Sequence, residues 1–147
     1  MRNMDRWLGD GGMRLLEAVG ARFTGYGIDD SGVAYAEAAW KPTSLACNPH
    51  GTVQGGVHSV LLDAAMNFAV NTALDGRDRT RASLEMKTET MRPAREGDDL
   101  RVRGEVVRLA RQVAYAEGRV LGSSGQLLSR ATGTFILHRE PGTASER

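Results

Sequence analysis

The hydrophobic positions along the chain follow two spacings, and the change between them separates strands from one long helix. Residues 22–46 form two extended runs around the turn sequence Asp29-Asp30-Ser31-Gly32, a pattern typical of a β-hairpin. Residues 57–74 are the longest apolar-rich stretch, and their apolar side chains recur at helical spacing around much of the cylinder. We expect this helix to be buried on most of its sides.

The second half of the chain predicts further strands. Residues 83–91, 100–107 and 113–119 have extended character, and a last strand is predicted over residues 127–137. Arg92-Pro93 should end the first of these strands, and Gly122-Ser123-Ser124-Gly125 is typical of a hairpin turn. The connections are short, which favours neighbouring antiparallel strands in one sheet. A single sheet curled around the central helix would bury both.

The two ends of the chain complete the predicted domain, which covers residues 1–147 and fits one compact unit by its length. Met13, Leu15, Leu16 and Val19 are spaced as in a short amphipathic helix, predicted over about residues 10–21. The tail after about residue 139 is polar. Strand edges remain unpaired in this arrangement, and pairing across a dimer would cover one of them.

Composition and charge exclude several classes of protein. The chain is 41% hydrophobic and 25% charged with a net charge of +1, which is too balanced for a general nucleic-acid binder. No apolar run is long enough to span a membrane, and the N-terminus lacks the pattern of a secretory signal. Cys47 is the only cysteine, so no internal disulfide forms, and we expect a reducing, cytoplasmic location.

The glycine pair Gly55-Gly56 lies where a loop meets the long helix. Glycine allows close approach of the backbone to a ligand, and the first free N–H groups of a helix attract negative charge. They would suit the oxyanion that forms when a carbonyl group is attacked. The simpler interpretation is that two glycines permit a tight turn, and both interpretations remain open.

Asp63 is the only carboxylate between Gly55 and Leu74, within the most apolar helix of the chain. Burial of an unpartnered carboxylate is expensive, so Asp63 either faces a polar pocket or lies on a narrow solvent stripe with Asn67, four residues later. Gly55 and Asp63 are about 12 Å apart along one helix. We therefore expect a site shared between two subunits, with Gly55 from one and Asp63 from the other.

The chain closely resembles the hotdog-fold acyl-CoA thioesterases at one residue and three motifs. These are Asn48, HGTVQGGV at 50–57, LLD at 61–63 and SLEMKTETMRPA at 83–94. The resemblance extends from about residue 36 to 137 and is nearest to the phenylacetate-pathway and 4-hydroxybenzoyl-CoA thioesterase types. It implies an α+β fold in which an antiparallel sheet wraps around one long central helix. It also implies hydrolysis of acyl-CoA to a carboxylic acid and free CoA, with no metal or redox cofactor, in a homodimer or homotetramer.

The same resemblance assigns catalytic roles. Gly55 matches the glycine whose N–H polarises the thioester carbonyl, and Asp63 matches the carboxylate that acts as nucleophile or general base. Asn48 matches a residue that orients the water or the substrate. Ser83 matches a serine that assists the carboxylate. Gly55 and Asn48 are then expected to face Asp63 and Ser83 across the dimer.

Further residues are expected to contact the substrate. They are Gln54, Gly56, Asn67, Arg92 and Arg111. The arginines lie at strand ends or turns, where the CoA phosphates of the family run, although a solvated arginine is the alternative for each. Gln54 departs from the family, which usually has histidine there, but glutamine can still hydrogen-bond. The helix face with Met66 and Phe68 is compatible with medium-chain or aromatic acyl groups.

Two other functions stay open. A hotdog dehydratase or hydratase would rely on an active-site histidine, and Gln54 argues against this. A non-catalytic acyl-CoA-binding protein would bind the ligand without releasing thiol. A Cys47 nucleophile is disfavoured because its neighbour His50 lies in a loop. For His50, His58 and His138 we expect structural or surface roles, since their spacing is unlike that of a zinc site.

Overall fold

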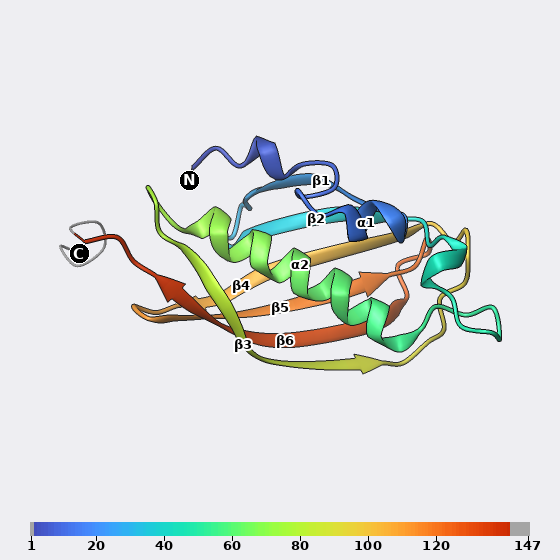
Figure 1. Ribbon diagram of the computed structural model, residues 1–147. Coiled ribbons are helices and arrows are strands. Elements are labelled where there is room, and N and C mark those ends of the chain that lie inside the picture. Colours follow the sequence, from blue (N-terminus) through green and yellow to red (C-terminus); the bar gives the residue numbers. More distant parts are fainter. Residues whose placement is uncertain (1, 142–147) are drawn as a thin grey trace.

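A computed structural model of the chain, which describes residues 2–141, has one six-stranded antiparallel sheet curled around one long helix (Figure 1). The strands are β1 (Ala21–Ile28), β2 (Ala34–Trp40), β3 (Arg79–Thr90), β4 (Leu100–Leu109), β5 (Val113–Leu121) and β6 (Leu127–His138). The α-helices are α1 (Arg14–Ala18) and α2 (Gly55–Ala73), and the 3-10 helices are η1 (Asp5–Trp7) and η2 (Ser44–Ala46). The sheet order is β1-β2-β4-β5-β6-β3, so the predicted α+β hotdog fold is confirmed.

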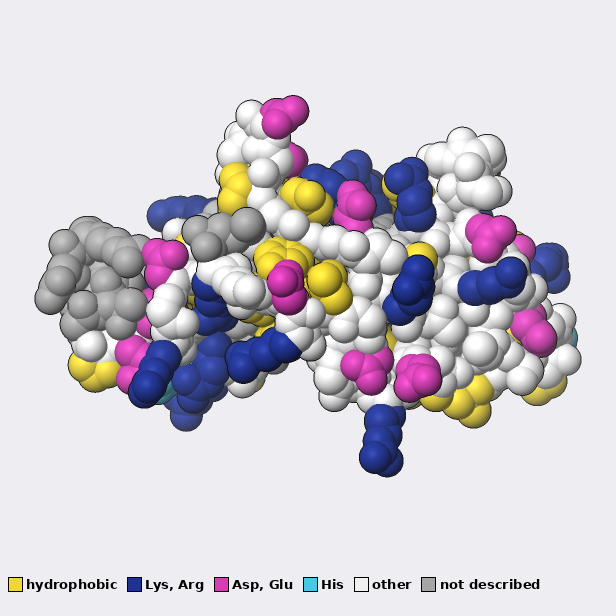
Figure 2. Space-filling view, turned by 90° about the horizontal axis from the view of Figure 1, so that it is seen from above, with side chains coloured by type: hydrophobic (Ala, Val, Ile, Leu, Met, Phe, Trp, Pro, Cys, Tyr) yellow, Lys and Arg dark blue, Asp and Glu magenta, His cyan; other side chains and the backbone are white. Residues whose placement is uncertain are grey.

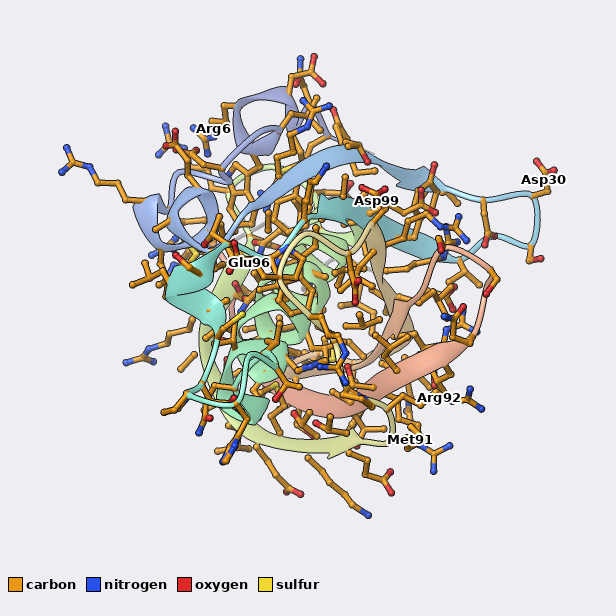
Figure 3. All side chains as sticks on the ribbon, turned by 90° about the vertical axis from the view of Figure 1, so that its right-hand side faces the viewer. Arg6, Asp30, Met91, Arg92, Glu96 and Asp99 are labelled. Atoms are coloured by element: carbon orange, nitrogen blue, oxygen red, sulfur yellow. The ribbon has the colours of Figure 1, made fainter. Side chains whose placement is uncertain are left out.

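The long helix α2 lies at the centre of the fold and contacts all six strands. The sheet is seen curling around it when the molecule is viewed from the end where α2 begins (Figure 3). Ten of its residues are buried: His58, Leu61, Leu62, Ala65, Met66, Phe68, Ala69, Val70, Asn71 and Thr72. The helix begins two residues before the predicted start, at Gly55, and the predicted burial on most sides is confirmed.

Two glycines of the sheet allow α2 to approach it closely. A Cβ atom added to Gly104 would lie 2.4 Å from both the carbonyl carbon and the carbonyl oxygen of Ala65. Gly118, the partner of Gly104 in the β4–β5 register, faces the Leu62 side chain at 3.0 Å by the same measure. The backbone of α2 therefore rests almost directly on β4, and the side chains of Leu62 and Met66 rest on β5.

The strand β3 forms one edge of the sheet and pairs only with β6. It begins at Arg79, four residues before the predicted start, and most of its side chains are exposed. The register with β6 shifts between Thr80 and Ala82 and again between Ser83 and Glu85. Such bulges bend an edge strand and turn individual side chains toward new neighbours.

The N-terminal segment crosses over β1 and α2. The predicted helix over residues 10–21 is wrong in its extent, because only Arg14–Ala18 is helical. Gly11, Gly12 and Gly20 have positive φ angles of 64°, 77° and 92°, and these interrupt the helix on both sides. Most of the predicted polar tail, residues 142–147, lies outside the described residues. Within residues 2–141 no helix is both long and apolar enough to cross a membrane.

His58 is fully buried on the sheet side of α2. Its Nδ1 lies 2.7 Å from Ser129 Oγ, and its ring meets the edge of Trp40 with centroids 5.4 Å apart. Its Nε2 is buried and has no hydrogen-bond partner among the described residues. Burial lowers the pKa of His58 because the charged imidazolium would lose its hydration. The structural role expected for this histidine agrees with its place in the core.

We expect the Gly104→Ala variant to lose about 3 kcal/mol or more of unfolding free energy, because the new methyl group would overlap the backbone of α2. Gly25→Ala is the matched control, since Gly25 lies in β1 with open space around its Cβ position. Urea unfolding of both variants at one protein concentration gives the comparison. Equal loss in the two variants would contradict the close approach of α2 to β4.

We expect part of the stability to be lost as the pH falls below about 6.5, the ordinary pKa of histidine. The unfolded chain then takes up a proton at His58, whereas the folded chain, in which its pKa is lowered, does not. The loss should reach at most about 1.4 kcal/mol per pH unit. Unfolding free energies from pH 7.5 to 5.5 should fall more steeply for the natural protein than for His58→Asn, and parallel profiles would refute this.

Candidate functional site

Asp63 lies on a half-buried stripe along one face of α2. Val60, Asp63, Ala64 and Asn67 follow the i, i+3, i+4, i+7 spacing of one helix face. This stripe forms one wall of a cavity of about 450 Å³. The other walls are made by Trp7, Gly11, Met13, Leu15, Leu16 and Phe23. A single carboxylate and one amide thus face an otherwise apolar cavity.

The Asp63 carboxylate is held through one of its two oxygens. Ser83 Oγ donates a hydrogen bond to Asp63 Oδ1 at 2.9 Å, and Asn67 Nδ2 donates to the same oxygen at 3.3 Å. No hydrogen bond to Asp63 Oδ2 is formed by any residue from 2 to 141. Donors at one oxygen fix the orientation of the carboxylate and leave the other oxygen available for a water or a ligand.

Ser83 reaches Asp63 because β3 is irregular at this point. The two register shifts of β3 flank Ser83, which pairs with Phe135 of β6. A bulge at a sheet edge is a common way to aim one side chain at a site. The structure therefore brings together three residues that the sequence singled out, Asp63, Asn67 and Ser83, from a helix and an edge strand.

The first turn of α2 is open to solvent. Gln54 is the N-cap residue, with φ −60° and ψ 135°, and its side chain makes no capping hydrogen bond. Gly55 and Gly56 are exposed, and a Cβ atom added to either would meet nothing within 4 Å. Neither residue has a positive φ angle, so the turn itself does not require glycine. The Val57 N–H donates to the carbonyl of Gln54 at 2.9 Å, whereas the N–H groups of Gly55 and Gly56 donate no hydrogen bond to any residue from 2 to 141.

One chain does not bring the start of α2 to the carboxylate. Gly55 and Asp63 are eight residues apart in one continuous helix, which corresponds to about 12 Å. A hydrogen bond from the Gly55 N–H to a group that is attacked at Asp63 would need a second copy of the chain. This separation agrees with the expectation of a shared site.

Asn48 is engaged within its own loop. Its Oδ1 accepts hydrogen bonds from the backbone N–H groups of His50 at 2.9 Å and Thr52 at 3.3 Å. Its Nδ2 donates to Thr52 Oγ1 at 2.9 Å. Side chains of this type shape turns by bonding to backbone groups a few residues ahead. In one chain, Asn48 organises the loop that leads into α2.

Arg92 and Arg111 lie at opposite ends of the sheet. The N–H of Arg92 donates to the carbonyl of Leu128 at the start of β6, and the carbonyl of Arg111 accepts from Arg139, just after its end. The twelve residues of β6 span roughly 36 Å between them. Figure 3 shows Arg92 at the periphery of the molecule. The two arginines therefore cannot contact the same phosphate within one chain, and neither lines the Asp63 cavity.

The remaining candidates lie apart from this cavity. Cys47 is half-buried, with Sγ 3.6 Å from the carbonyl oxygen of Thr43. His50 is exposed, and His138 Nε2 lies 3.1 Å from Glu140 Oε1. Among the described residues, no three potential metal ligands come together.

The sequence did not single out the apolar residues that wall the cavity opposite Asp63. Met13, the residue before α1, and Leu15 within it are 42% and 46% exposed. Hydrophobic side chains are visible between charged ones on the face that the N-terminal segment helps to form (Figure 2). Their spacing had predicted only that this segment packs on the body of the protein.

A sequence model of the family described as Thioesterase superfamily matches residues 50–129, which is more than half of the 147-residue chain. A Pseudomonas aeruginosa protein that carries the name of an esterase is 31% identical over 91 residues. That match covers 62% of this chain and 66% of the other, just under two thirds of its length.

Solved structures with similar folds include two proteins named for phenylacetic acid degradation. A mutant of the Thermus thermophilus protein is 26% identical with a TM-score of 0.71, covering 84% of this chain and 98% of that one. The Ralstonia eutropha protein is 25% identical with a TM-score of 0.73, covering 84% and 89%. A Haemophilus influenzae thioesterase shares the fold. It is 18% identical with a TM-score of 0.75, and the match covers 87% of this chain and 86% of that one.

Proposed function

The chain belongs to the thioesterase superfamily, and from this premise we propose that it hydrolyses acyl-CoA thioesters to a carboxylic acid and free CoA, with Asp63 as the reacting carboxylate. The proposed acyl groups are aromatic or medium-chain. The active form is a homodimer, or a tetramer of two such dimers, with each site at the interface of two subunits.

The observation that carries this proposal is the Asp63 carboxylate on the wall of an apolar cavity, held at Oδ1 and unbonded at Oδ2. A carboxylate fixed in this way has the geometry of a general base or nucleophile. The apolar walls suit the acyl group of a thioester. No histidine is among the described residues that line the cavity, which favours hydrolysis over a histidine-dependent dehydratase or hydratase.

The proposed reaction follows from the free oxygen of Asp63. As general base, Oδ2 takes a proton from a water molecule whose oxygen attacks the thioester carbon, and negative charge develops on the carbonyl oxygen. The bond between carbon and sulfur then breaks, and the CoA thiolate receives the proton from Asp63. In the nucleophilic variant, Asp63 itself attacks and displaces CoA, and water hydrolyses the resulting anhydride. Ser83 and Asn67 position the carboxylate in both variants.

The oxyanion is stabilised by the N–H of Gly55 from the second subunit. Apart from their own neighbours along the chain, no described residue lies within 4 Å of a Cβ atom placed on Gly55 or Gly56, and their φ angles do not demand glycine. Close approach of a substrate explains both glycines, because any side chain there would intervene between the ligand and the backbone. The positive end of the α2 dipole adds to the stabilisation of the developing charge.

We expect Asp63→Asn to lower kcat for acyl-CoA hydrolysis by about 10²–10⁴-fold with little change in melting temperature, since asparagine keeps an oxygen for the Ser83 hydrogen bond. Asp30→Asn is the control, because Asp30 is an exposed carboxylate in the β1–β2 turn (Figure 3). Thiol release measured with an aromatic and a medium-chain acyl-CoA gives the rates. Full activity of Asp63→Asn would remove this residue from the mechanism.

We expect Gly55→Pro to lower kcat by about 10²–10³-fold, because it deletes one N–H that is proposed to bind the oxyanion. Proline is tolerated at the first position of a helix, and the extended conformation of Gln54 is the one a residue before proline prefers. Gly55→Ala is the comparison, because it keeps the N–H and adds a side chain at the same position; the loss of kcat in Gly55→Pro beyond that in Gly55→Ala measures the N–H. If Gly55→Pro keeps its full kcat, the Gly55 amide does not bind the oxyanion.

Mixing these two variants tests whether the site is shared. A dimer of one Asp63→Asn and one Gly55→Pro subunit has one intact site and one site with both defects, if each site draws on two chains. Equal, freely exchanging subunits should then recover about one quarter of the natural activity. A site within one chain would show no recovery.

A further inference from the structure

We infer that the N-terminal segment, residues 4–16, forms the acyl-binding wall of the active site and that Trp7 limits the size of the acyl group. The inference rests on the proposed thioesterase function. Five of the ten residues that line the Asp63 cavity come from this segment: Trp7, Gly11, Met13, Leu15 and Leu16. All five lie outside the matched residues 50–129, so this wall is not part of the region that defines the family.

Hydrogen bonds and packing hold the segment at its start, its middle and its end. At its start, Tyr26 Oη accepts a hydrogen bond from the Met4 N–H at 2.9 Å and donates one to Asp5 Oδ1 at 2.7 Å. In its middle, the Gly9 N–H donates to the carbonyl of Phe23 at 3.0 Å. At its end, Leu16 is buried in the core. These contacts hold the segment as a fixed wall rather than as a loose cover.

Trp7 lines the cavity and packs against a buried aromatic ring. Its ring meets Phe68 edge-on, with centroids 5.3 Å apart and an interplanar angle of 73°. Phe23, which also lines the cavity, contacts Phe68 with ring centroids 4.8 Å apart. Phe68 is itself fully buried, so the ring behind Trp7 cannot recede to lengthen the cavity. Aromatic rings arranged in this way favour the edge of another ring.

The size of the cavity limits the acyl group that it admits. Its volume of about 450 Å³ lies in the lower half of the range for ligand sites. Asp63 and Asn67 lie in its wall about one helical turn apart, and Trp7 is among the other residues that line it. A cavity of this size favours a compact acyl group, such as one aromatic ring, over a long fatty chain.

The exposed apolar residues of the segment fit the same inference. Met13 and Leu15 are exposed in one chain because they border the open cavity, where an acyl group would cover them. Leu8 is exposed to a similar degree, 36%, but does not line the cavity. Leu8 is therefore a matched control for Trp7, adjacent in sequence and similar in character.

The size limit is tested by comparing kcat/KM for benzoyl-CoA and palmitoyl-CoA in the natural protein and three variants. Trp7→Ala should raise the palmitoyl-to-benzoyl ratio by about tenfold, because it removes the largest side chain that lines the cavity. Leu8→Ala and Trp7→Phe should leave the ratio within about threefold of the natural value, since the first lies outside the cavity and the second keeps a ring. A ratio that is the same in Trp7→Ala and Leu8→Ala would overturn the inference.

A second measurement does not depend on turnover. The chain has two tryptophans, and Trp40 is only 1% exposed in the core. Titration of Asp63→Asn with benzoyl-CoA should therefore give a saturable fluorescence change from Trp7, which disappears in the Asp63→Asn/Trp7→Phe double variant. Absence of the change in the single variant, or its persistence in the double variant, would show that Trp7 does not border the ligand.

The two tests separate the inference from the proposed function. If the natural protein hydrolyses an acyl-CoA and Asp63→Asn does not, the function stands whatever happens at Trp7. An unchanged substrate ratio then overturns the acyl wall alone. If the natural protein hydrolyses neither aromatic nor medium-chain acyl-CoA, the proposed function fails first and the inference fails with it.

Discussion

The close contact between α2 and the sheet at Gly104 fixes the rest of the structure. Because no side chain separates β4 from the helix backbone at Ala65, α2 cannot rotate about its axis without a clash. Asp63 precedes Ala65 by two residues, about 200° around the helix, so it points away from β4. The packing of two glycines against a helix thus determines which face of α2 is left for a site.

The stripe on that face is polar at Asp63 and Asn67, and these two side chains are hydrogen-bonded to each other. A half-buried carboxylate is costly unless it is hydrogen-bonded, and Ser83 and Asn67 supply two donors. Both donors bind Oδ1, so the stabilising contacts leave Oδ2 free for chemistry. The irregular register of β3 is what places Ser83 within reach, which ties the edge of the sheet to the site.

In the proposed enzyme, one part of the chain carries the reacting groups and another part forms the wall that binds the acyl group. The region that matches the thioesterase superfamily contains Gly55, Asp63 and Ser83, which we propose to carry the reaction. The N-terminal segment contributes apolar surface alone, and it is held by hydrogen bonds to β1 that do not involve the reacting groups. Such a division lets the acyl preference change without any change at the carboxylate.

The periodicity of the sequence predicted the strands, the long helix and a sheet curled around it, and a lone acid in an apolar helix singled out Asp63, because these are local features. The hotdog fold was implied by the resemblance of its motifs to a known family. The periodicity misjudged the extent of the first helix, since positive φ angles at Gly11, Gly12 and Gly20 depend on the path of the chain over β1. The resemblance implied that Ser83 assists Asp63, but only the tertiary structure showed that the register shifts of β3 flank Ser83, that Arg92 and Arg111 lie at opposite ends of the sheet, and that Trp7 lines the cavity. These relations depend on strand register and on packing between distant segments, which no local pattern encodes.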